Sequence, residues 1–446
     1  MDHPGDSLAA MSETQAPRRV DSRAMRPLRM AETGQPAPFR LGAPAYLVAF
    51  GGWIVAAALL LGSAGELTAL AVSEGGPVGA AHAIGLVFFP FAVAAAAWQL
   101  LPVMLRNDPS RPALRWVVLG LLVGGLPLAV GVATDRAALA AFGSVVLASG
   151  LVLLLAELAS LVRGAPSGRM LVVSRVAVAL AGANAASAFI LGAVVLSDGG
   201  PEPLGVPYER LLLVHLSLAL IGWLTVLIAA VGRTLVPMLG LSAAARPRRA
   251  PLAELTLVAG LWLFVAGVAG SVDALVATGV VVMLGGLAAP ARLFARVAIS
   301  GTIGVREGPV AHVALGLVFL AQAALLALAA AAGSLSDRRA AIAGVLFLGI
   351  GWAVGVIVGH AGKLISLSGW GSWPPGPRPR QADLYPRAVW QVEVVLFAVG
   401  VELLAGGVAL DAETAARAGG VLLVAAALVA LGAALETVRR VVAARP

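Results

Sequence analysis

The feature that most constrains this chain is a series of long apolar segments that follow one another along almost its whole length. Each is close to or longer than the roughly 20 residues that a helix needs to cross a bilayer. Of the 446 residues, 60% are hydrophobic and 12% are charged, whereas soluble domains carry about 25% charged residues. Apolar and polar residues do not alternate with a period of two, which excludes a membrane β-barrel. The sequence therefore predicts an all-α, polytopic membrane protein.

The lengths of the apolar segments predict about twelve transmembrane helices. They form one transmembrane domain at 41–440, preceded by a basic tail at 1–40 that lacks the apolar core of a signal peptide and is expected to be disordered. A Pro-rich loop at 370–387 is expected to lie extended at the cytoplasmic face. The predicted spans are 43–64, 80–104, 113–133, 137–162, 171–197, 210–238, 251–271, 274–297, 309–333, 340–367, 388–409 and 415–438.

Arginines gather in alternate loops, and the loops between carry mainly acidic residues. By the positive-inside rule the Arg-rich loops are cytoplasmic, and the basic termini place both chain ends in the cytoplasm of a multi-pass protein of the cell inner membrane. The net charge of +8 is thus explained by topology and by anionic lipid, so the bilayer is the expected partner and nucleic acid is not. The arginines that define these loops are Arg106, Arg111 and Arg115; Arg163, Arg169 and Arg175; Arg246, Arg248 and Arg249; Arg292, Arg296 and Arg306; and Arg378, Arg380 and Arg387.

One sequence element recurs in the second, sixth and tenth segments. Each contains an Ile-Gly pair, at Gly85, Gly222 and Gly351, and polar residues follow about two turns or more later. The spacing predicts three pseudo-repeats of four helices, roughly at 41–165, 171–300 and 305–440. The alternative explanation is that helices rich in Ala, Gly and Leu resemble one another by composition.

Four histidines lie inside apolar segments, where an unpaired imidazole is costly to desolvate. Because the chain has no cysteine, a metal or heme would depend on imidazole, Met, carboxylate or backbone ligands. The predicted topology puts two of them in the outer half, on the second and sixth helices, and two near the inner face, on the ninth and tenth. The outer pair is His82 and His215, and the inner pair is His312 and His360.

The second segment resembles a helix of a known family. His82 opens the stretch HAIGLVFFPF, and WQLLPVML follows from Trp98. This is similar to the second helix of the catalytic subunit of heme-copper oxidases, which opens with an axial histidine of the low-spin heme and ends in a similar turn. Twelve helices in three pseudo-repeats is also that family's architecture, and His215 falls where the family keeps a copper ligand. The resemblance implies heme b, copper as a further metal, and other respiratory membrane subunits as partners.

The chain departs from that family at the oxygen-reducing center. The seventh helix, which reads LAELTLVAGLW from Leu252 to Trp262, lacks the tandem histidines, and the tenth lacks the early His-x-His pair. A complete heme–copper center therefore cannot be built. The histidine-poorer relatives, including the NnrS family of heme- and copper-binding proteins linked to nitric oxide, are the better comparison, although the WHxHE-like signature of that family is missing.

The candidate residues also have simpler explanations. His82 fits either a ligand role or a position at the end of an outer helix, and His215 fits either a ligand role or a place on a Leu-rich helix without one. His312 is expected to be solvated. His360 is expected to lie in a polar crevice beside Gly359. Glu254 and Glu393 are expected to reach water, and Glu402 to serve either a proton path or a hydrogen bond to a neighbouring helix. Arg233 and Lys363 would hold heme propionates or phospholipid headgroups, or snorkel to the interface.

Two other classes of function fit twelve helices. A secondary transporter shares the number of spans and the cytoplasmic termini, but a repeat near 130 residues differs from the six-plus-six plan of the major facilitators. A non-enzymatic sensor or assembly factor in the same scaffold is the third class. The favoured prediction is a heme- or copper-binding membrane protein related to respiration or nitric oxide handling, and the alternative is a secondary transporter of a small solute or metal ion.

Overall fold

The computed structural model describes residues 38–72, 75–105, 112–164, 169–198, 205–242, 250–301, 304–331, 333–374 and 376–444. Within these ranges the chain forms helices joined by turns, and it forms no strand. Twelve helices of this part of the chain are long and apolar enough to cross a membrane. The protein is therefore an all-α, multi-pass membrane protein, as its sequence predicts. Nearly all of the tail predicted at 1–40 lies outside the described residues.

Several spans consist of more than one helical segment. The first four spans are α1 (Pro38–Gly62), then α3 (Gly75–His82), η2 (Ala83–Phe88) and α4 (Phe89–Leu105), then α5 (Pro112–Leu122) and α6 (Gly125–Ala133), then α7 (Ala137–Gly164). The next four are α8 (Arg169–Asp198), then α9 (Tyr208–Ser217), η4 (Leu218–Thr225) and α10 (Val226–Leu239), then α11 (Ala250–Gly270) and α12 (Asp273–Ser300). The last four are α13 (Gly308–Ala331), then α14 (Asp337–Leu346), η6 (Phe347–Val354) and α15 (Gly355–Gly371), then α16 (Arg387–Ala409) and α17 (Glu413–Ala443). Short helices α2 (Ala64–Thr68), η5 (Gly304–Arg306) and η7 (Gln381–Leu384) lie in the connections.

A π-helical segment interrupts the second, sixth and tenth spans. These segments, η2, η4 and η6, contain Gly85, Gly222 and Gly351, the three glycines of the repeat found in the sequence. A π segment shifts the backbone hydrogen bonds by one residue and leaves carbonyls to be satisfied from elsewhere. Asn184 of α8 donates its side-chain amide to the Gly222 carbonyl at 3.2 Å, which satisfies one of them.

The three interrupted spans contact one another at equal depth, so we call them the central helices. Phe89 meets Trp223 edge-to-face with ring centroids 6.3 Å apart, and Trp352 Nε1 donates to Thr225 Oγ1 at 3.2 Å. Gln99 Nε2 donates to the Leu364 carbonyl at 2.7 Å. The central helices are therefore parallel and in register. We call the end of the bundle where they begin the start end, and the end where they stop the finish end.

The third and fourth, seventh and eighth, and eleventh and twelfth spans form three matching hairpins. In each, two glycines 19 residues apart bring the backbones together, at 124 and 143, 260 and 279, and 400 and 419. A Cβ added at Gly143, Gly279 or Gly419 would lie 2.7 Å from the carbonyl oxygen of the partner glycine. Only glycine permits this approach, and small residues at helix contacts are how membrane helices pack closely.

The turns of the three hairpins also match. Asp135, Ser271 and Asp411 have φ angles of 51°, 56° and 58°, in the left-handed region. The amide of the following residue donates to the carbonyl five residues back at 2.8 to 2.9 Å, which satisfies a carbonyl at the helix end. The recurrence of one hairpin in each group of four spans shows that the three-fold repeat is a property of the fold and not of composition alone.

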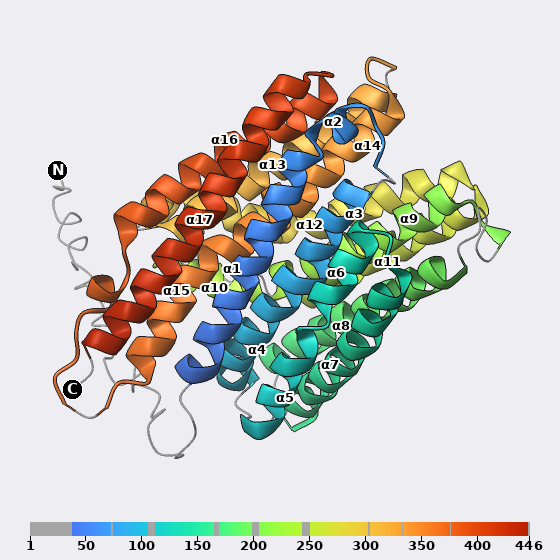
Figure 1. The fold of residues 1–446 in the computed structure, drawn as a ribbon. Helices are drawn as coiled ribbons and strands as arrows, with labels where there is room; N and C mark the ends of the chain where they lie inside the picture. The colour runs from blue at the N-terminus through green and yellow to red at the C-terminus, as the bar shows by residue number, and fades with distance from the viewer. Residues whose placement is uncertain are drawn as a thin grey trace, which may run out of the picture. The chain divides into compact units, whose positions relative to one another are not determined.

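Helices from the two ends of the described chain pack side by side. Figure 1 shows α1, in blue, beside α17, in red, and α1 also packs on α4 of the second span. At the start end the Arg339 guanidinium of α14 donates to the carbonyls of Thr68 and Val408 at 3.1 and 3.0 Å and pairs with Asp411 at 2.8 Å. This side chain joins the first and third groups of spans.

Two adjacent glycines of α12 test the close packing of the hairpins. A Cβ at Gly286 would lie 2.4 Å from the Leu257 backbone nitrogen, whereas a Cβ at Gly285 would meet nothing within 4 Å. We expect Gly286→Ala to lower the stability of the purified protein by about 1–3 kcal/mol, because the backbones must separate. Gly285→Ala should leave the stability unchanged or raise it by up to about 1 kcal/mol. Thermal unfolding in detergent measures both, and equal effects would contradict the packing.

Candidate functional site

The structure places His82 and His215 at the same end of two adjacent central helices. His82 is the last residue of α3, and His215 lies near the end of α9, so each comes shortly before the π segment of its central helix. His82 precedes Phe89 by seven residues and His215 precedes Trp223 by eight, and those two rings are in contact. The two half-buried imidazoles are close enough to influence each other electrostatically. The predicted adjacency of the second and sixth helices is thus correct.

Both imidazoles are oriented in the same way by a backbone carbonyl. His82 Nδ1 lies 2.8 Å from the Val78 carbonyl oxygen, and His215 Nδ1 lies 2.8 Å from that of Ala188 in α8. Because a carbonyl can only accept, Nδ1 must carry the proton in both rings. This leaves Nε2 of each neutral ring as a lone pair. A backbone carbonyl on Nδ1 is the usual partner of a histidine that binds a metal through Nε2.

A glycine makes room for the His215 ring. A Cβ at Gly192 of α8 would lie 2.8 Å from His215 Cε1 and 3.2 Å from Nδ1, so the imidazole rests directly on the backbone of the fifth span. His215 is thus held both by the Ala188 carbonyl and by the surface of α8.

The number of ligands limits what this pair could hold. No group of three or more His, Cys, Asp or Glu side chains that could hold a metal ion occurs among the described residues. A tetrahedral zinc site needs four ligands. A heme needs one or two axial imidazoles, and its iron is otherwise held by the porphyrin. Two imidazoles are too few for such a tetrahedral site, and two is the largest number of axial imidazoles that a heme iron takes.

The expectation that His312 is solvated was wrong. His312 and Glu393 are both 0% exposed, and His312 Nε2 lies 2.8 Å from Glu393 Oε2. The ring of Phe397 packs edge-on against the imidazole with centroids 5.1 Å apart. Glu393, which was expected to reach water, is thus the buried partner of a histidine on a neighbouring helix.

His360 lies near His312, and its Nδ1 is also held by a backbone carbonyl. His360 Nδ1 lies 2.6 Å from the Val356 carbonyl of its own helix, and the side chain is buried. A Cβ at Gly359 would lie 2.6 Å from His312 Cβ, and one at Gly355 would lie 3.4 Å from His312 Nδ1. The glycines beside His360 therefore accommodate His312.

Lys363 takes part in a polar cluster at the finish end that the sequence did not reveal. Its Nζ lies 2.9 Å from Glu307 Oε2 and 4.2 Å from the centre of the Tyr385 ring. Tyr385 stacks on Trp390, with an interplanar angle of 4°. Burial, together with the carboxylates of Glu307 and Glu393, raises the pKa of the Tyr385 hydroxyl above its ordinary value, so the phenol stays protonated. Lys363, predicted to hold a lipid headgroup or a heme propionate or to snorkel, is paired with a carboxylate in this structure.

Arg233 does not snorkel to the interface either. It is 6% exposed, and its Nη2 lies 3.0 Å from Oε1 of Glu254, which is 1% exposed. Glu254 is therefore enclosed and does not reach water. Arg233 follows His215 by 18 residues, about 27 Å along a helix, so it cannot hold the propionates of a heme bound at His215.

Two further carboxylates bond to neighbouring helices. Glu402 Oε1 accepts from Gln322 Nε2 at 2.7 Å, which is the hydrogen bond that the sequence left as one of two explanations. Glu157 of α7 accepts from Arg115 Nε at 2.6 Å and from Trp98 Nε1 at 2.8 Å. Arg115 was assigned only a topological role from the sequence, because its partner is 42 residues away.

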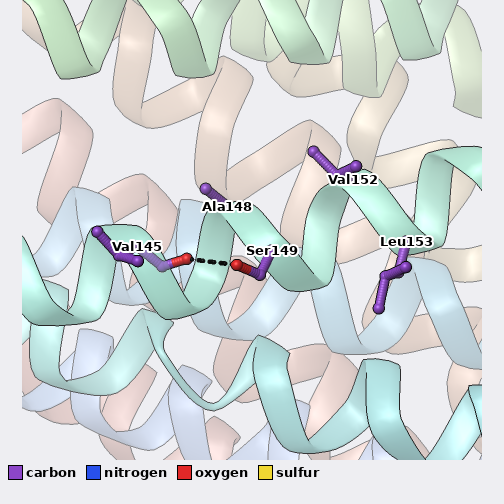
Figure 2. A pocket seen from close by; sticks show the side chains of 5 residues that line it. All are labelled: Val145, Ala148, Ser149, Val152 and Leu153. Carbon is purple, nitrogen blue, oxygen red and sulfur yellow. Dashed lines mark hydrogen bonds between the residues drawn. The ribbon is translucent and has the colours of Figure 1, made fainter.

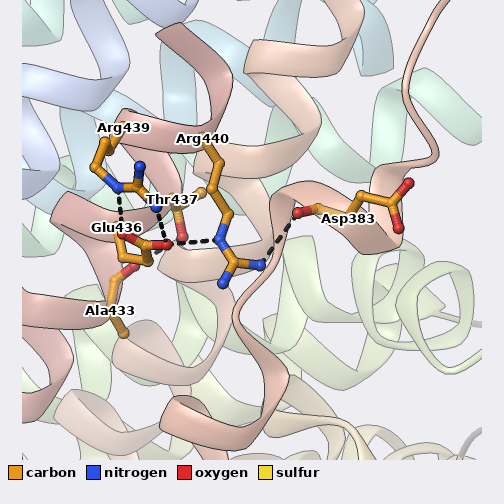
Figure 3. A network of polar contacts seen from close by, with 6 residues as sticks. All are labelled: Asp383, Ala433, Glu436, Thr437, Arg439 and Arg440. Atoms are coloured by element: carbon orange, nitrogen blue, oxygen red, sulfur yellow. Dashed lines mark hydrogen bonds and ion pairs between the residues drawn. The ribbon is translucent and has the colours of Figure 1, made fainter. Parts of the chain in front are cut away.

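Charged side chains at the end of α17 fasten the loop that carries Tyr385. Figure 3 shows Glu436 between Arg439 and Arg440, with Glu436 accepting hydrogen bonds from both at 2.6 to 2.8 Å. Arg440 Nη1 also donates to the Asp383 carbonyl at 3.1 Å. The last helix thereby holds the segment from Asp383 to Tyr385 against the finish end.

A hollow on the surface of α7 has an almost entirely apolar lining, unlike the polar groups described above. Figure 2 shows its lining, in which the single hydroxyl, that of Ser149, donates to the Val145 carbonyl of the same helix at 2.9 Å. Val145 and Val152 are 69% and 63% exposed, as expected of a surface that faces lipid. None of the candidate residues lines this hollow, and it offers a ligand no free polar group.

Comparison with known proteins does not assign the chain to a family. No protein-family model matches the sequence, and no curated protein matches it significantly.

The Arg233–Glu254 pair provides a test of the buried charges. We expect Glu254→Gln to cost about 3–5 kcal/mol of stability, because it leaves a buried guanidinium unpaired. The double variant Arg233→Met/Glu254→Gln should recover most of the loss, since no charge remains. Glu413→Gln, in an exposed pair with Arg417 one turn away, is the control and should change little. Thermal unfolding in detergent measures all three, and an equally small loss at both sites would show that Arg233 reaches solvent.

Proposed function

We propose that this is a membrane protein that binds a heme between His82 and His215, at the start end of its central helices. The observation that carries the proposal is the matched pair of imidazoles, each with Nδ1 on a carbonyl at 2.8 Å, so that the lone pair of a neutral ring is at Nε2, for which no hydrogen bond to the described residues is found. The arrangement of twelve helices in three groups supports it, because it agrees with the resemblance to heme-copper oxidases. No complete oxygen-reducing center is part of the proposal.

Heme b would supply reversible one-electron chemistry at this position. His82 and His215 would hold the group through their Nε2 atoms; two imidazole ligands would suit electron transfer, whereas one would leave room for a small gas ligand. The protein's contribution is to fix the tautomer of both rings through Val78 and Ala188 and to keep the site in an apolar surrounding. A role in respiration or in nitric oxide handling, in the cell inner membrane and alongside other respiratory subunits, follows from this chemistry.

Copper is the other metal that two imidazoles suit, because copper favours nitrogen ligands. It would use the same Nε2 atoms, so heme and copper compete as occupants of one site.

The decisive experiment is the absorption spectrum of the purified protein, oxidised and reduced, with elemental analysis for iron and copper. We expect a Soret band and a sharp α band on reduction, as low-spin heme gives. His82→Ala and His215→Ala should each alter the spectrum, whereas His312→Asn should not. Copper without these bands would change the cofactor at the same two residues. Unchanged spectra in both outer variants would move the heme to His312 and His360.

A secondary transporter is the second candidate, favoured by the ion pairs buried within the spans at Arg233–Glu254 and His312–Glu393. Carboxylates and cations inside membrane helices commonly mark ion paths. Protein that contains neither heme nor a transition metal would leave transport as the function.

The contact of Gly192 with His215 yields a further prediction. We expect Gly192→Ala to alter the heme spectrum in the same direction as His215→Ala, since the new methyl would displace the imidazole. Gly182→Ala on the same helix is the control, because its Cβ would meet only a Leu155 methyl at 3.3 Å. Identical spectra for the two glycine variants would argue against His215 as a ligand.

A further inference from the structure

A line of ionisable side chains runs from the finish end to the fully buried pair of His312 and Glu393. Arg387, at the start of α16, has a side chain 46% exposed and lies 3.7 Å from Glu307. The side chains of Glu307 and Lys363 are 10% and 14% exposed, and Tyr385 is 3% exposed. Side-chain exposure thus falls from 46% at Arg387, through 10–14% at Glu307 and Lys363, to the 0% of the buried pair.

The buried pair is suited to hold one shared proton. A bare carboxylate or a bare imidazolium in this apolar surrounding would be costly, whereas an imidazole and a carboxyl joined by one proton are neutral together. The distance of 2.8 Å between His312 Nε2 and Glu393 Oε2 is that of a direct hydrogen bond. The proton therefore belongs to the pair and not to either side chain alone.

The same pair has two unused positions for a second proton. His312 Nδ1 and Glu393 Oε1 are both buried and have no hydrogen-bond partner among the described residues. Each can accept a proton while Nε2 and Oε2 stay bonded. A buried polar atom without a partner is uncommon and needs a reason. Proton uptake would explain why His312 Nδ1 and Glu393 Oε1 are ionisable groups buried without a partner, whereas packing alone does not explain it.

Tyr385 lies between the pair and the finish end. It is within electrostatic reach of both Glu307 and Glu393, and Lys363 Nζ lies over its ring. Its hydroxyl is also buried without a hydrogen-bond partner among the described residues, and it is the group nearest to where a Cβ of Gly308 would lie, at 2.8 Å. A protonated phenol can donate and accept, so it can pass a proton between the two carboxylates.

Other elements packed around the pair bring mainly aromatic rings. From α1, Phe50 packs on Trp390 and Trp53 packs on Phe397. The charged and titratable groups on the surrounding elements are Arg40 and Tyr46 of α1, Arg306 of η5, Glu307 before α13, Asp337, Arg338 and Arg339 of α14, His360 and Lys363 of α15, Asp383 of η7 and Tyr385 after it, Arg387 and Glu402 of α16, and Glu413, Arg417, Glu436, Arg439 and Arg440 of α17.

The same two helices carry a second pair that serves as an internal comparison. Gln322 of α13 and Glu402 of α16 are joined at 2.7 Å, as His312 of α13 and Glu393 of α16 are joined at 2.8 Å. An amide cannot take up a proton near neutral pH, whereas an imidazole can. The Gln322–Glu402 pair thus shows that an amide suffices for a packing contact between these helices. The His312–Glu393 pair has an ionisable imidazole in the place of that amide.

We propose that His312 and Glu393 form a proton-accepting pair that is loaded from water at the finish end through Glu307, Lys363 and Tyr385. In the step, a proton leaves water or hydronium at that face and an N–H or O–H bond forms at the pair. No electron moves, so no oxidant or reductant is needed. The proposal does not depend on a cofactor at His82 and His215, and it applies equally to a redox protein and to a transporter.

Infrared difference spectroscopy of the full-length protein in lipid nanodiscs tests the acceptor. Spectra at about pH 5 and about pH 9 bracket the titration of an imidazole. We expect a carboxylic acid band, shifted in D2O, that grows at the lower pH, is absent from Glu393→Gln and titrates at a different pH in His312→Asn. The matched variant Glu402→Gln should keep the band. A band that persists in Glu393→Gln, or that does not change between the two pH values, would overturn the proposal.

The rate of deuterium exchange into the same band tests the route. Tyr385→Phe removes one oxygen and Glu307→Gln one charge, and both should slow the exchange several-fold while the size of the band at equilibrium stays the same. Arg339→Lys, at the opposite end of the bundle, should leave the rate unchanged. Normal exchange in both route variants would refute the path even where the pair itself titrates. Because these substitutions leave the pair intact, the test does not depend on whether Glu393→Gln folds.

Discussion

Close contact between helix backbones is the constraint on which this structure depends. Within a bilayer, apolar side chains gain little by leaving lipid for one another, so helices are held by close packing and by polar contacts. Here the close packing is provided by three matched hairpins in which paired glycines bring backbones together. The polar contacts, such as those of Gln99 and of Trp352, join the central helices. The hairpins form the outer frame of each group of spans and leave the central helices to meet.

The register of the central helices determines which side chains can act together. Because these helices are parallel and equal in depth, residues at equal distances from the π segments become neighbours. His82 and His215 lie at the same end of adjacent central helices for that reason, although 133 residues separate them in the chain. Arg233 lies 18 residues after His215 in the same span, about 27 Å along the helix, so a group held by the two histidines cannot also be held by this arginine.

Much of the fold could be predicted from the sequence, because a bilayer requires segments whose length and apolar character are visible in one dimension. The twelve spans are such features, and so is the Ile-Gly element that the π segments contain. The surroundings of His312 and of Arg233 could not be predicted, since each depends on one partner, Glu393 or Glu254, on another helix. Glu307 and Tyr385 were missed because they lie in connections, where no periodicity indicates a neighbour. The glycine spacing of 19 residues was visible in the sequence, but its meaning required the paired backbones.

The two ends of the bundle differ in the kind of polar group that they enclose. At the start end, His82 and His215 are half-buried imidazoles whose Nδ1 atoms donate to backbone carbonyls. Toward the finish end the buried groups are acid–base pairs, His312 with Glu393 and Arg233 with Glu254. The carboxyl of each pair can gain or lose a proton while its partner limits the cost of burying a charge. A protein that only needed to fill these positions would use apolar residues or amides, as it does at Gln322. The concentration of ionisable pairs at one end therefore argues that protons are exchanged there, whatever group the other end binds.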